Sequence, residues 1–235
     1  DIDTILLKTP KNKQILLFSA TMPKEVLKIS KSYMKNPHII EIAKRNEGAK
    51  NVTHSYHIVS SKERYSALRR LCDYNPKIYS IVFCRTRREC KDVSSKLMKD
   101  GYNADALHGD LSQSQRDYVM DKFRQKNIEI LVATDVAARG LDVNNITHII
   151  NYNLPDDNEV YVHRSGRTGR ANKKGESIII STNRDSKKIK LIEKMINKKI
   201  ELNEIPSGEM ICEKQLLNQI NNVIDSPIDV QINKY

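Results

Sequence analysis

Ten residues in the last third of the chain, YVHRSGRTGR (161–170), combine four basic side chains with two glycines. On a helix of 100° per residue, His163, Arg167 and Arg170 fall within about 60° of one another, so three bases share one face. Each glycine costs roughly 1 kcal/mol inside a helix. We therefore expect the helix to end at the glycines and the arginines to bind a phosphate, which guanidinium groups contact in bidentate fashion. The alternative is a plain helix end whose arginines offset the helix dipole.

A second stretch, LVATDVAARGLDV (131–143), runs from an apolar segment directly into a polar turn. Open α/β sheets bind ligands at the carboxyl ends of their strands, where this turn would lie. The hydroxyl of Thr134 and the nearby backbone amides suit a phosphate, whereas the carboxylate of Asp142 suits ribose hydroxyls. An acidic turn with a purely structural role is the alternative.

A third stretch, LHGDLSQSQRDYVMDKFR, contains a capping box made by Ser112 and Gln115, which predicts the start of a helix. The free amides of that start, together with Gly109 and Arg116, favour an anion site. In the alternative, Arg116 only pairs with an acidic neighbour such as Asp117 or Asp121.

A fourth stretch, VFCRTRREC, places Arg85, Arg87 and Arg88 around Thr86, where a strand ends and a helix begins. Positive side chains at the positive end of a helix dipole repel it and one another. We therefore expect an anion to bind here and relieve this repulsion.

Two common phosphate-binding patterns are missing from the sequence. No two glycines lie five positions apart, so GxxxxGK followed by Ser or Thr cannot occur, and GxGxxG is absent as well. No pair of adjacent acidic residues closes a strand to hold magnesium, and no metal site is expected. The arginines therefore predict half of a phosphate site.

The composition is compatible with a nucleic-acid partner. The chain has 235 residues and a net charge of +11, from 40 Lys and Arg against 29 Asp and Glu. A positive charge of this size attracts polyanions such as nucleic acid, and the alternative is that it only keeps the protein soluble. The four cysteines form no CxxC pair and have no zinc-site spacing. No apolar run approaches the roughly 20 residues that span a bilayer, and the start does not resemble a signal peptide. We expect a soluble cytoplasmic protein that does not contact a membrane.

Short apolar runs alternate with amphipathic segments, the pattern of an α/β fold with a mostly parallel sheet covered on both faces. The expected strands are 52–60, 79–84, 103–108, 128–135, 146–154 and 176–182, and the expected helices are 62–74, 87–100, 112–126, 157–166 and 184–198.

The rest of the chain predicts the domain organisation. Residues 1–40 contain an apolar strand over 13–21, which ends in Ser19 and Thr21, and then a helix over 23–36, but no partner strand. We interpret 1–40 as a remnant of another domain that either packs on a neighbouring chain or is loosely held, because an unpaired apolar strand invites pairing. The polar segment 41–51 is interpreted as a linker, 52–203 as the main domain, and 204–235 as a C-terminal extension with one more amphipathic segment.

In order and spacing, these motifs resemble those of the C-terminal half of DEAD-box RNA helicases, over nearly all of residues 14–200. The matching segments are SAT (19–21) for motif III, IVFCRT (81–86) for motif IV, Gln113 with Arg116 for the QxxR element, VATDVAARGLD (132–142) for motif V and HRSGRTGR (163–170) for motif VI.

The resemblance implies two RecA-like domains, each a three-layer sandwich of a central sheet between helices, that close on ATP and RNA together. The second domain would be complete in 52–203, and 1–40 would be the last portion of the first. The Walker A loop and the DEAD box, which bind most of the ATP and the Mg²⁺, are expected before Asp1.

The resemblance also implies individual roles. Arg167 and Arg170 would be arginine fingers against the γ-phosphate, and Asp142, with Gly140 beside it, would hold the ribose. His163 would couple motif VI to Ser19 and Thr21 in the closed state. The residues implied to contact the RNA backbone are Arg85, Thr86, Gly109, Gln113, Arg116, Thr134 and Asp135.

Three hypotheses follow from the sequence. In the first, the chain is the C-terminal half of an ATP-dependent RNA helicase that unwinds short duplexes with its N-terminal domain and is inactive alone. In the second, it is an autonomous, non-specific RNA-binding module. In the third, a homodimer forms through the exposed N-terminal remnant or the C-terminal extension, although a helix that packs back on the core is favoured over dimerisation through the extension.

Overall fold

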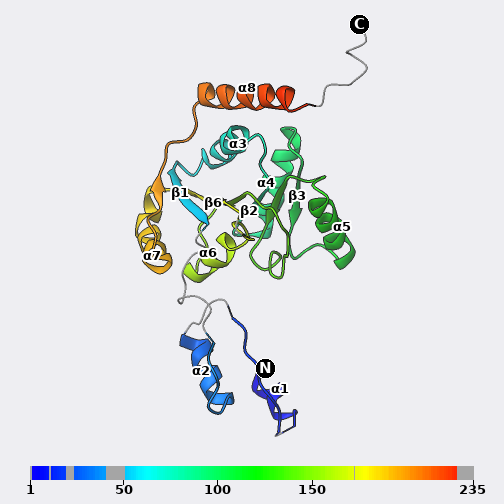
Figure 1. Cartoon of the computed structure of the whole chain (residues 1–235), viewed down its shortest axis with the longest axis vertical. Helices are drawn as coiled ribbons and strands as arrows, with labels where there is room; N and C mark the ends of the chain where they lie inside the picture. The colour runs from blue at the N-terminus through cyan, green and yellow to red at the C-terminus, as the bar shows by residue number, and fades with distance from the viewer. Residues whose placement is uncertain (1, 11, 20–23, 41–50, 172, 227–235) are drawn as a thin grey trace. The chain divides into compact units, whose positions relative to one another are not determined.

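A computed structural model describes residues 2–10, 12–19, 24–40, 51–171 and 173–226. The chain divides into two compact units, Asp1–Glu47 and Gly48–Tyr235, and each is described by itself (Figure 1). The boundary falls within the predicted linker, of which only Asn51 lies among the described residues. The assignment of these units to particular domains stays a prediction.

The larger unit is built on a seven-stranded sheet in the order β3-β4-β2-β5-β6-β1-β7. Every strand pair is parallel, so the sheet is entirely parallel where the sequence predicted a mostly parallel one. The strands are β1 (Val52–Ile58), β2 (Ser80–Phe83), β3 (Ala104–Leu107), β4 (Ile130–Ala133), β5 (His148–Asn151), β6 (Gly175–Ser181) and β7 (Glu201–Leu202). The first six lie inside the predicted runs, except that β6 begins one residue earlier, and β7, with two residues, was not predicted.

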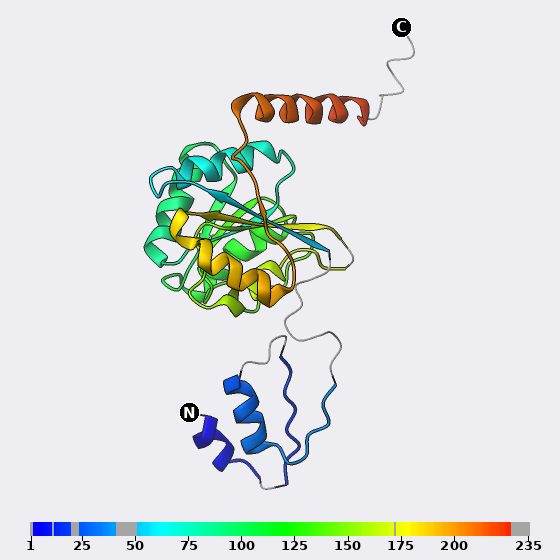
Figure 2. The ribbon, with the colours of Figure 1, turned by 90° about the vertical axis from the view of Figure 1, so that its left-hand side faces the viewer.

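Helices cover both faces of the sheet because alternate strand residues are apolar on both sides. In β2, Val82 packs into the cluster under α3 (Arg64–Tyr74) and α4 (Arg87–Lys99), whereas Ile81 and Phe83 pack toward α5 (Gln113–Arg124). The remaining helices on the α5 side are α6 (Asn158–Ser165) and α7 (Ser186–Ile196). Figure 2 shows α3 and α7 on opposite sides of the sheet. This is the RecA-like three-layer α/β fold that the sequence predicts.

The predicted helix boundaries near the motifs have clear local causes. The capping box is confirmed: Gln115 N donates to Ser112 Oγ at 3.3 Å, and Ser112 N donates to Gln115 Oε1 at 2.9 Å. The helix of the opening motif ends at Ser165, with Gly166 as its C-cap, as expected from the glycines. Arg167 and Arg170 therefore lie beyond the helix, and the prediction that three bases share one helical face is wrong for these two.

The C-terminal part of the larger unit includes one helix, α8, beyond the predicted domain of residues 52–203. A 3-10 turn (Asn183–Asp185) precedes α7, and α8 (Gly208–Ile224) lies against α3 (Figure 1). Its side chains toward α3 are only partly buried, and none of its residues is fully buried. Helix α8 therefore packs back on the domain, but only loosely.

The smaller unit contains α1 (Ile2–Leu7) and α2 (Lys24–Tyr33). The predicted buried strand over 13–21 is wrong for its described part: residues 13–19 form no strand, and Leu16 and Phe18 are 66% and 87% exposed. A strand is stable only when its backbone N–H and C=O groups form hydrogen bonds with a neighbouring strand. No other described segment of this unit is a strand. Thr21 lies outside the described residues.

Candidate functional site

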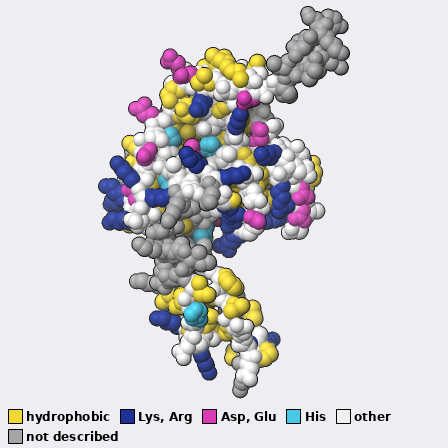
Figure 3. Space-filling model, viewed as in Figure 1, with side chains coloured by type: hydrophobic (Ala, Val, Ile, Leu, Met, Phe, Trp, Pro, Cys, Tyr) yellow, Lys and Arg dark blue, Asp and Glu magenta, His cyan; other side chains and the backbone are white. Residues whose placement is uncertain are grey.

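The predicted site segments gather at one edge of the sheet. Arg85 follows β2, Gly109 follows β3 and Thr134 follows β4, and these three strands are neighbours in the sheet. Because all strands are parallel, their carboxyl ends share this edge, as ligand sites in open α/β sheets do. Basic side chains are spread over the visible face of this unit (Figure 3).

Arg167 and Arg170 converge on one turn of the loop after β4. Arg167 Nη1 donates to the main-chain oxygen of Leu141 at 2.6 Å, and Arg170 Nη1 pairs with Asp142 Oδ1 at 2.8 Å. Partial burial, followed by the charge of Arg170, lowers the pKa of Arg167. Arg170 also donates from Nε to the oxygen of Gly166 at 3.0 Å, which folds its side chain back toward the helix end. The two guanidinium groups therefore lie close together although neither is in the helix.

The turn that carries Asp142 requires a glycine. Gly140 has a φ of +72°, in the left-handed region, and a Cβ there would meet no neighbouring atom. The carboxylate of Asp142 is largely exposed apart from its ion pair with Arg170. It is therefore accessible to a further ligand.

Arg164 is the functional residue that the sequence reasoning missed. It is 2% exposed and holds the carboxylate of Asp135 in bidentate fashion, at 2.6 Å from Nε and 2.7 Å from Nη2. Its Nη1 donates to Asn151 Oδ1 at 3.0 Å and to the oxygen of Asn153 at 2.7 Å. The guanidinium also stacks over the ring of Phe83, 4.8 Å from its centroid.

Arg164 therefore fixes α6 to the carboxyl ends of β4 and β5. A signal for this role was present, because Arg164 lies about 100° around the helix from His163, off the predicted basic face. The carboxylate of Asp135 has a structural partner in Arg164, and its predicted contact with RNA stays a prediction.

The loop after β2 is stabilised by the protein's own groups. Thr86 Oγ1 caps α4 by accepting from Glu89 N at 3.1 Å, and the Arg85 side chain contacts the oxygen of Leu154 and, at 3.3 Å, the carboxylate of Asp156.

The arginines that follow this loop pair with acidic side chains. Arg87 pairs with Asp110 at 2.5 Å, and Arg88 lies 4.0 Å from Asp92. Nearby carboxylates thus already offset part of the repulsion among these arginines, and binding of an external anion stays a prediction.

The start of α5 is tied to the loop after β4. Arg116 Nη2 donates to the main-chain oxygen of Ala137 at 3.2 Å, while Gln113 Nε2 donates to Asp117 Oδ1 at 2.8 Å. The alternative in which Asp117 is the partner of Arg116 is therefore not what the structure shows. Thr134, at the end of β4, is buried, and its N donates to the oxygen of Leu107 at 3.3 Å.

The predicted coupling residues lie in different units. Ser19 belongs to the smaller unit and His163 to the larger, so their coupling stays a prediction. Within the described residues, no group of three His, Cys, Asp or Glu side chains could hold a metal ion, and no helix is long and apolar enough to cross a membrane.

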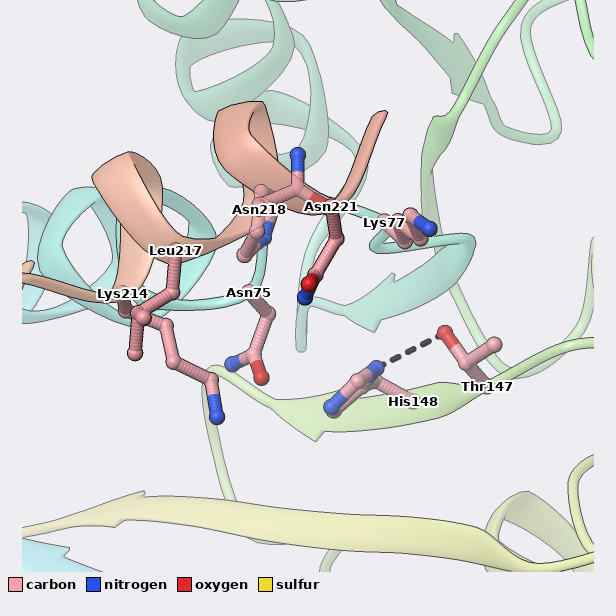
Figure 4. A pocket seen from close by; sticks show the side chains of 9 residues that line it. Asn75, Lys77, Thr147, His148, Lys214, Leu217, Asn218 and Asn221 are labelled. Atoms are coloured by element: carbon pink, nitrogen blue, oxygen red, sulfur yellow. Dashed lines mark hydrogen bonds between the residues drawn. The ribbon is translucent and has the colours of Figure 1, made fainter. Parts of the chain in front are cut away.

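A separate hollow of about 440 Å³ lies at the other edge of the sheet (Figure 4). Its walls come from α8, from the turn that contains Lys77, and from His148 at the start of β5. His148 Nδ1 and Thr147 Oγ1 share a hydrogen bond of 2.7 Å, drawn in Figure 4. None of the predicted site residues lines this hollow.

Comparison with known proteins identifies the family to which the chain belongs. Residues 63–172 match the family described as the helicase conserved C-terminal domain. The DEAD-box ATP-dependent RNA helicase CshA of Bacillus cereus is 40% identical over 229 residues, which cover 96% of this chain and 44% of CshA. The probable ATP-dependent RNA helicase MJ0669 of Methanocaldococcus jannaschii is 49% identical over 200 residues, which cover 85% of this chain and 53% of the relative.

Among solved structures, the chain is similar to the Escherichia coli DEAD-box protein SrmB bound to the regulator RraA. The identity is 30% and the TM-score 0.62, over 68% of this chain and 94% of that one. The chain belongs to the DEAD-box RNA helicase family, and the match to the conserved C-terminal domain lies within its larger unit. It spans about half the length of the curated relatives that it matches.

Proposed function

We propose that this chain is the C-terminal part of an ATP-dependent RNA helicase, which supplies arginine fingers and half of the groove for the RNA backbone. The observation that carries the proposal is the convergence of Arg167 and Arg170 on the Leu141–Asp142 turn. The sequence has no GxxxxGK pattern to cradle the phosphates. The arginines would therefore complete a nucleotide site whose other half belongs to a first RecA-like domain.

The residues present fit a nucleotide. Two neighbouring guanidinium groups suit the γ-phosphate, and the exposed carboxylate of Asp142 suits the ribose hydroxyls. Because Asp142 pairs with Arg170, ribose binding would loosen this ion pair and release Arg170 toward the phosphate. Since the described residues hold no cluster of metal ligands, Mg²⁺ would be bound mainly by the first domain, where it would neutralise charge on the phosphates.

The proposed role of the arginines is to stabilise charge on the transferring phosphoryl group, an effect worth about 10³ to 10⁵ in rate. Because they would come from a second domain, hydrolysis would depend on domain closure, which His163 would couple to Ser19 and Thr21. The same closure would grip one RNA strand and separate a short duplex locally. The strand would contact the carboxyl edge, where Arg85, Thr86, Gly109, Gln113, Arg116, Thr134 and Asp135 lie.

The test joins this chain to a first RecA-like domain and measures ATP hydrolysis with and without RNA. We expect no RNA-stimulated hydrolysis from the chain alone and clear stimulation in the joined protein. Arg167→Ala in the joined protein should remove most turnover and leave RNA binding within about twofold. Equal loss of hydrolysis and binding would refute the finger role, and hydrolysis by the chain alone would refute the half-site.

An autonomous RNA-binding module is the second candidate, favoured by the basic groups at the carboxyl edge. RNA binding by the chain alone that is tight and unaffected by joining the first domain would support it. We propose instead that the chain alone binds RNA weakly and with a strong salt dependence. A cytoplasmic location also stays a prediction.

Self-association is a further proposal, supported by α8. Its apolar side chains on one face are 45–74% exposed: Leu216, Leu217, Ile220, Val223 and Ile224. Such an exposed stripe is typical of an interaction surface. We propose that it pairs with a second copy of this chain.

A further inference from the structure

A large share of the net positive charge lies in α7 and the residues next to it. Residues 184–199 contain seven Lys and Arg against two acidic residues, so this short segment carries +5 of the net charge of +11. None of the predicted RNA contacts lies in this segment. The motifs therefore leave this basic segment unexplained.

The arrangement of α7 places its lysines away from the core. Ile189, Ile192 and Ile196 are buried against β6 and α6 and form the inner face of the helix. Lys187, Lys190 and Lys194 fall within about 60° of one another on the opposite side and are exposed. We call these three residues the lysine face. Figure 3 shows dark blue side chains at the left edge of the larger unit, where Figure 1 places α7.

Unlike several bases of α4 and α5, the lysine face pairs with no acidic side chain among the residues that the structure describes. On α4, Lys91 pairs with Asp110 at 2.9 Å, and on α5 Arg124 pairs with Asp121 at 3.0 Å. Within the described part of the chain, no ion pair involves Lys187, Lys190 or Lys194.

The two acidic residues of the segment serve the backbone instead. Asp185 accepts from Thr182 N at 2.7 Å, and Glu193 accepts from Ile200 N at 2.8 Å. Three like charges on one face repel one another, and an external polyanion would relieve this repulsion.

The start of α7 adjoins the predicted RNA groove. Lys188 Nζ donates to the main-chain oxygen of Asp156 at 2.9 Å, and Arg85 Nη2 lies 3.3 Å from the carboxylate of the same residue. The lysine face begins one residue before Lys188 and extends along the helix for about 10 Å. A strand that passes Arg85 would therefore meet the start of α7 next.

We propose that the lysine face of α7 binds the phosphates of the RNA strand that extends beyond the predicted groove at Arg85. This inference rests on the proposed function, because that groove defines where the strand lies. Lysine amines contact phosphates as point charges, so the surface would add affinity without sequence preference.

The test compares two single-stranded RNAs, of about 6 and about 16 nucleotides, because the shorter fills only the groove and the longer passes beyond it. The variant carries Lys187→Gln, Lys190→Gln and Lys194→Gln in the whole chain. At low salt we expect its Kd for the longer RNA to rise about tenfold, and the slope of log K against log salt to fall by about 2. Its Kd for the shorter RNA should stay within about twofold of the original.

The matched control removes three lysines from the other side of the sheet, with Lys77→Gln, Lys96→Gln and Lys99→Gln, and should leave both affinities nearly unchanged. Arg116→Ala reports on the groove and should weaken both RNAs. If the two triple variants weaken binding equally, the α7 proposal is overturned. It is also overturned if the α7 variant binds the longer RNA as tightly as the original chain while Arg116→Ala still weakens binding. Either result leaves the groove proposal standing. Binding of neither RNA by the unmodified chain overturns the groove as well.

Discussion

Arginines of a single motif have different surroundings in this protein. Arg164 is buried and donates to Asp135, Asn151 and Asn153, whereas Arg167 and Arg170 reach the turn that precedes Val143. The first is a positioning residue, which fixes α6 at the carboxyl edge, and the other two are the proposed fingers.

Removing Arg164 should therefore affect stability first. Arg164→Ala leaves the partly buried carboxylate of Asp135 unpaired, and the loss of one partner of a buried pair costs about 3–5 kcal/mol. Arg88→Ala is the control, because this arginine is exposed and 4.0 Å from its partner, and it should cost less than about 0.5 kcal/mol. Urea unfolding of both variants measures the difference. Similar free energies of unfolding would contradict the structural role.

Two glycines of the site provide a second test, because both have left-handed backbones but different surroundings. A Cβ at Gly169 would lie 2.6 Å from Val52 Cγ2, whereas at Gly140 it would meet nothing within 4 Å. Gly140→Ala should cost about 1 kcal/mol, from backbone strain alone. Gly169→Ala should cost at least about 1 kcal/mol more, because overpacking is added to strain. Thermal unfolding measures both, and equal costs would show that Val52 moves aside freely.

At the scale of elements, a buried polar network joins β1, α6 and β6. His54 Nδ1 and Tyr161 Oη share a hydrogen bond of 2.8 Å, and Ser177 Oγ donates to Tyr161 Oη at 3.2 Å. Burial, followed by the charge of Lys198, lowers the pKa of His54 to about 4. Burial also lowers the pKa of the neighbouring His57. The helix that carries the proposed finger motif is thus attached to the sheet partly through a neutral histidine.

This network predicts acid sensitivity. His54 has a pKa of 6.5 in the unfolded chain and of about 4 in the folded protein. Its contribution to the free energy of unfolding is therefore complete above pH 6.5 and is lost as the pH falls toward 4. The loss should reach about 3 kcal/mol. His54→Gln should make the free energy of unfolding less dependent on pH in this window. An unchanged pH profile, measured by urea unfolding at several pH values, would exclude His54 as a source.

At the scale of the whole molecule, polar and apolar surfaces are divided between different parts of the larger unit. Basic groups include those of α7 and of the carboxyl edge, whereas the exposed apolar stripe lies on the side of α8 that faces away from α3. The intermediate burial of Ile211, Gln215 and Asn218 shows that α8 turns a mainly polar face toward the domain. Its apolar face is left for another surface.

Sedimentation should therefore depend on α8. We expect the chain to sediment as a dimer and a chain without residues 206–235 to sediment as a monomer. Leu217→Lys combined with Ile220→Lys should have the same effect with α8 retained, because both side chains belong to the stripe. A monomeric full chain would contradict self-association, and a dimer after truncation would shift the contact to the N-terminal unit.

The sequence by itself determined the six main strands, the five helices that follow five of them, the capping box of α5 and the end of α6 at Gly166, because apolar periodicity, caps and glycines act over a few residues. It also determined the family, because the order and spacing of the motifs are visible along the sequence without knowledge of the fold. It failed for residues 13–19, where a strand pattern had no neighbour.

Only the tertiary structure decided the strand order and the pairs that depend on it. Arg164 with Asp135, and Arg87 with Asp110, join residues more than twenty positions apart, and the order β3-β4-β2-β5 brings their segments together. Arg167 and Arg170 converge because a loop folds back beneath them, not because they share a helical face. Local sequence patterns determine which charged residues lie at the carboxyl ends of the strands, but long-range packing determines which residues they pair with.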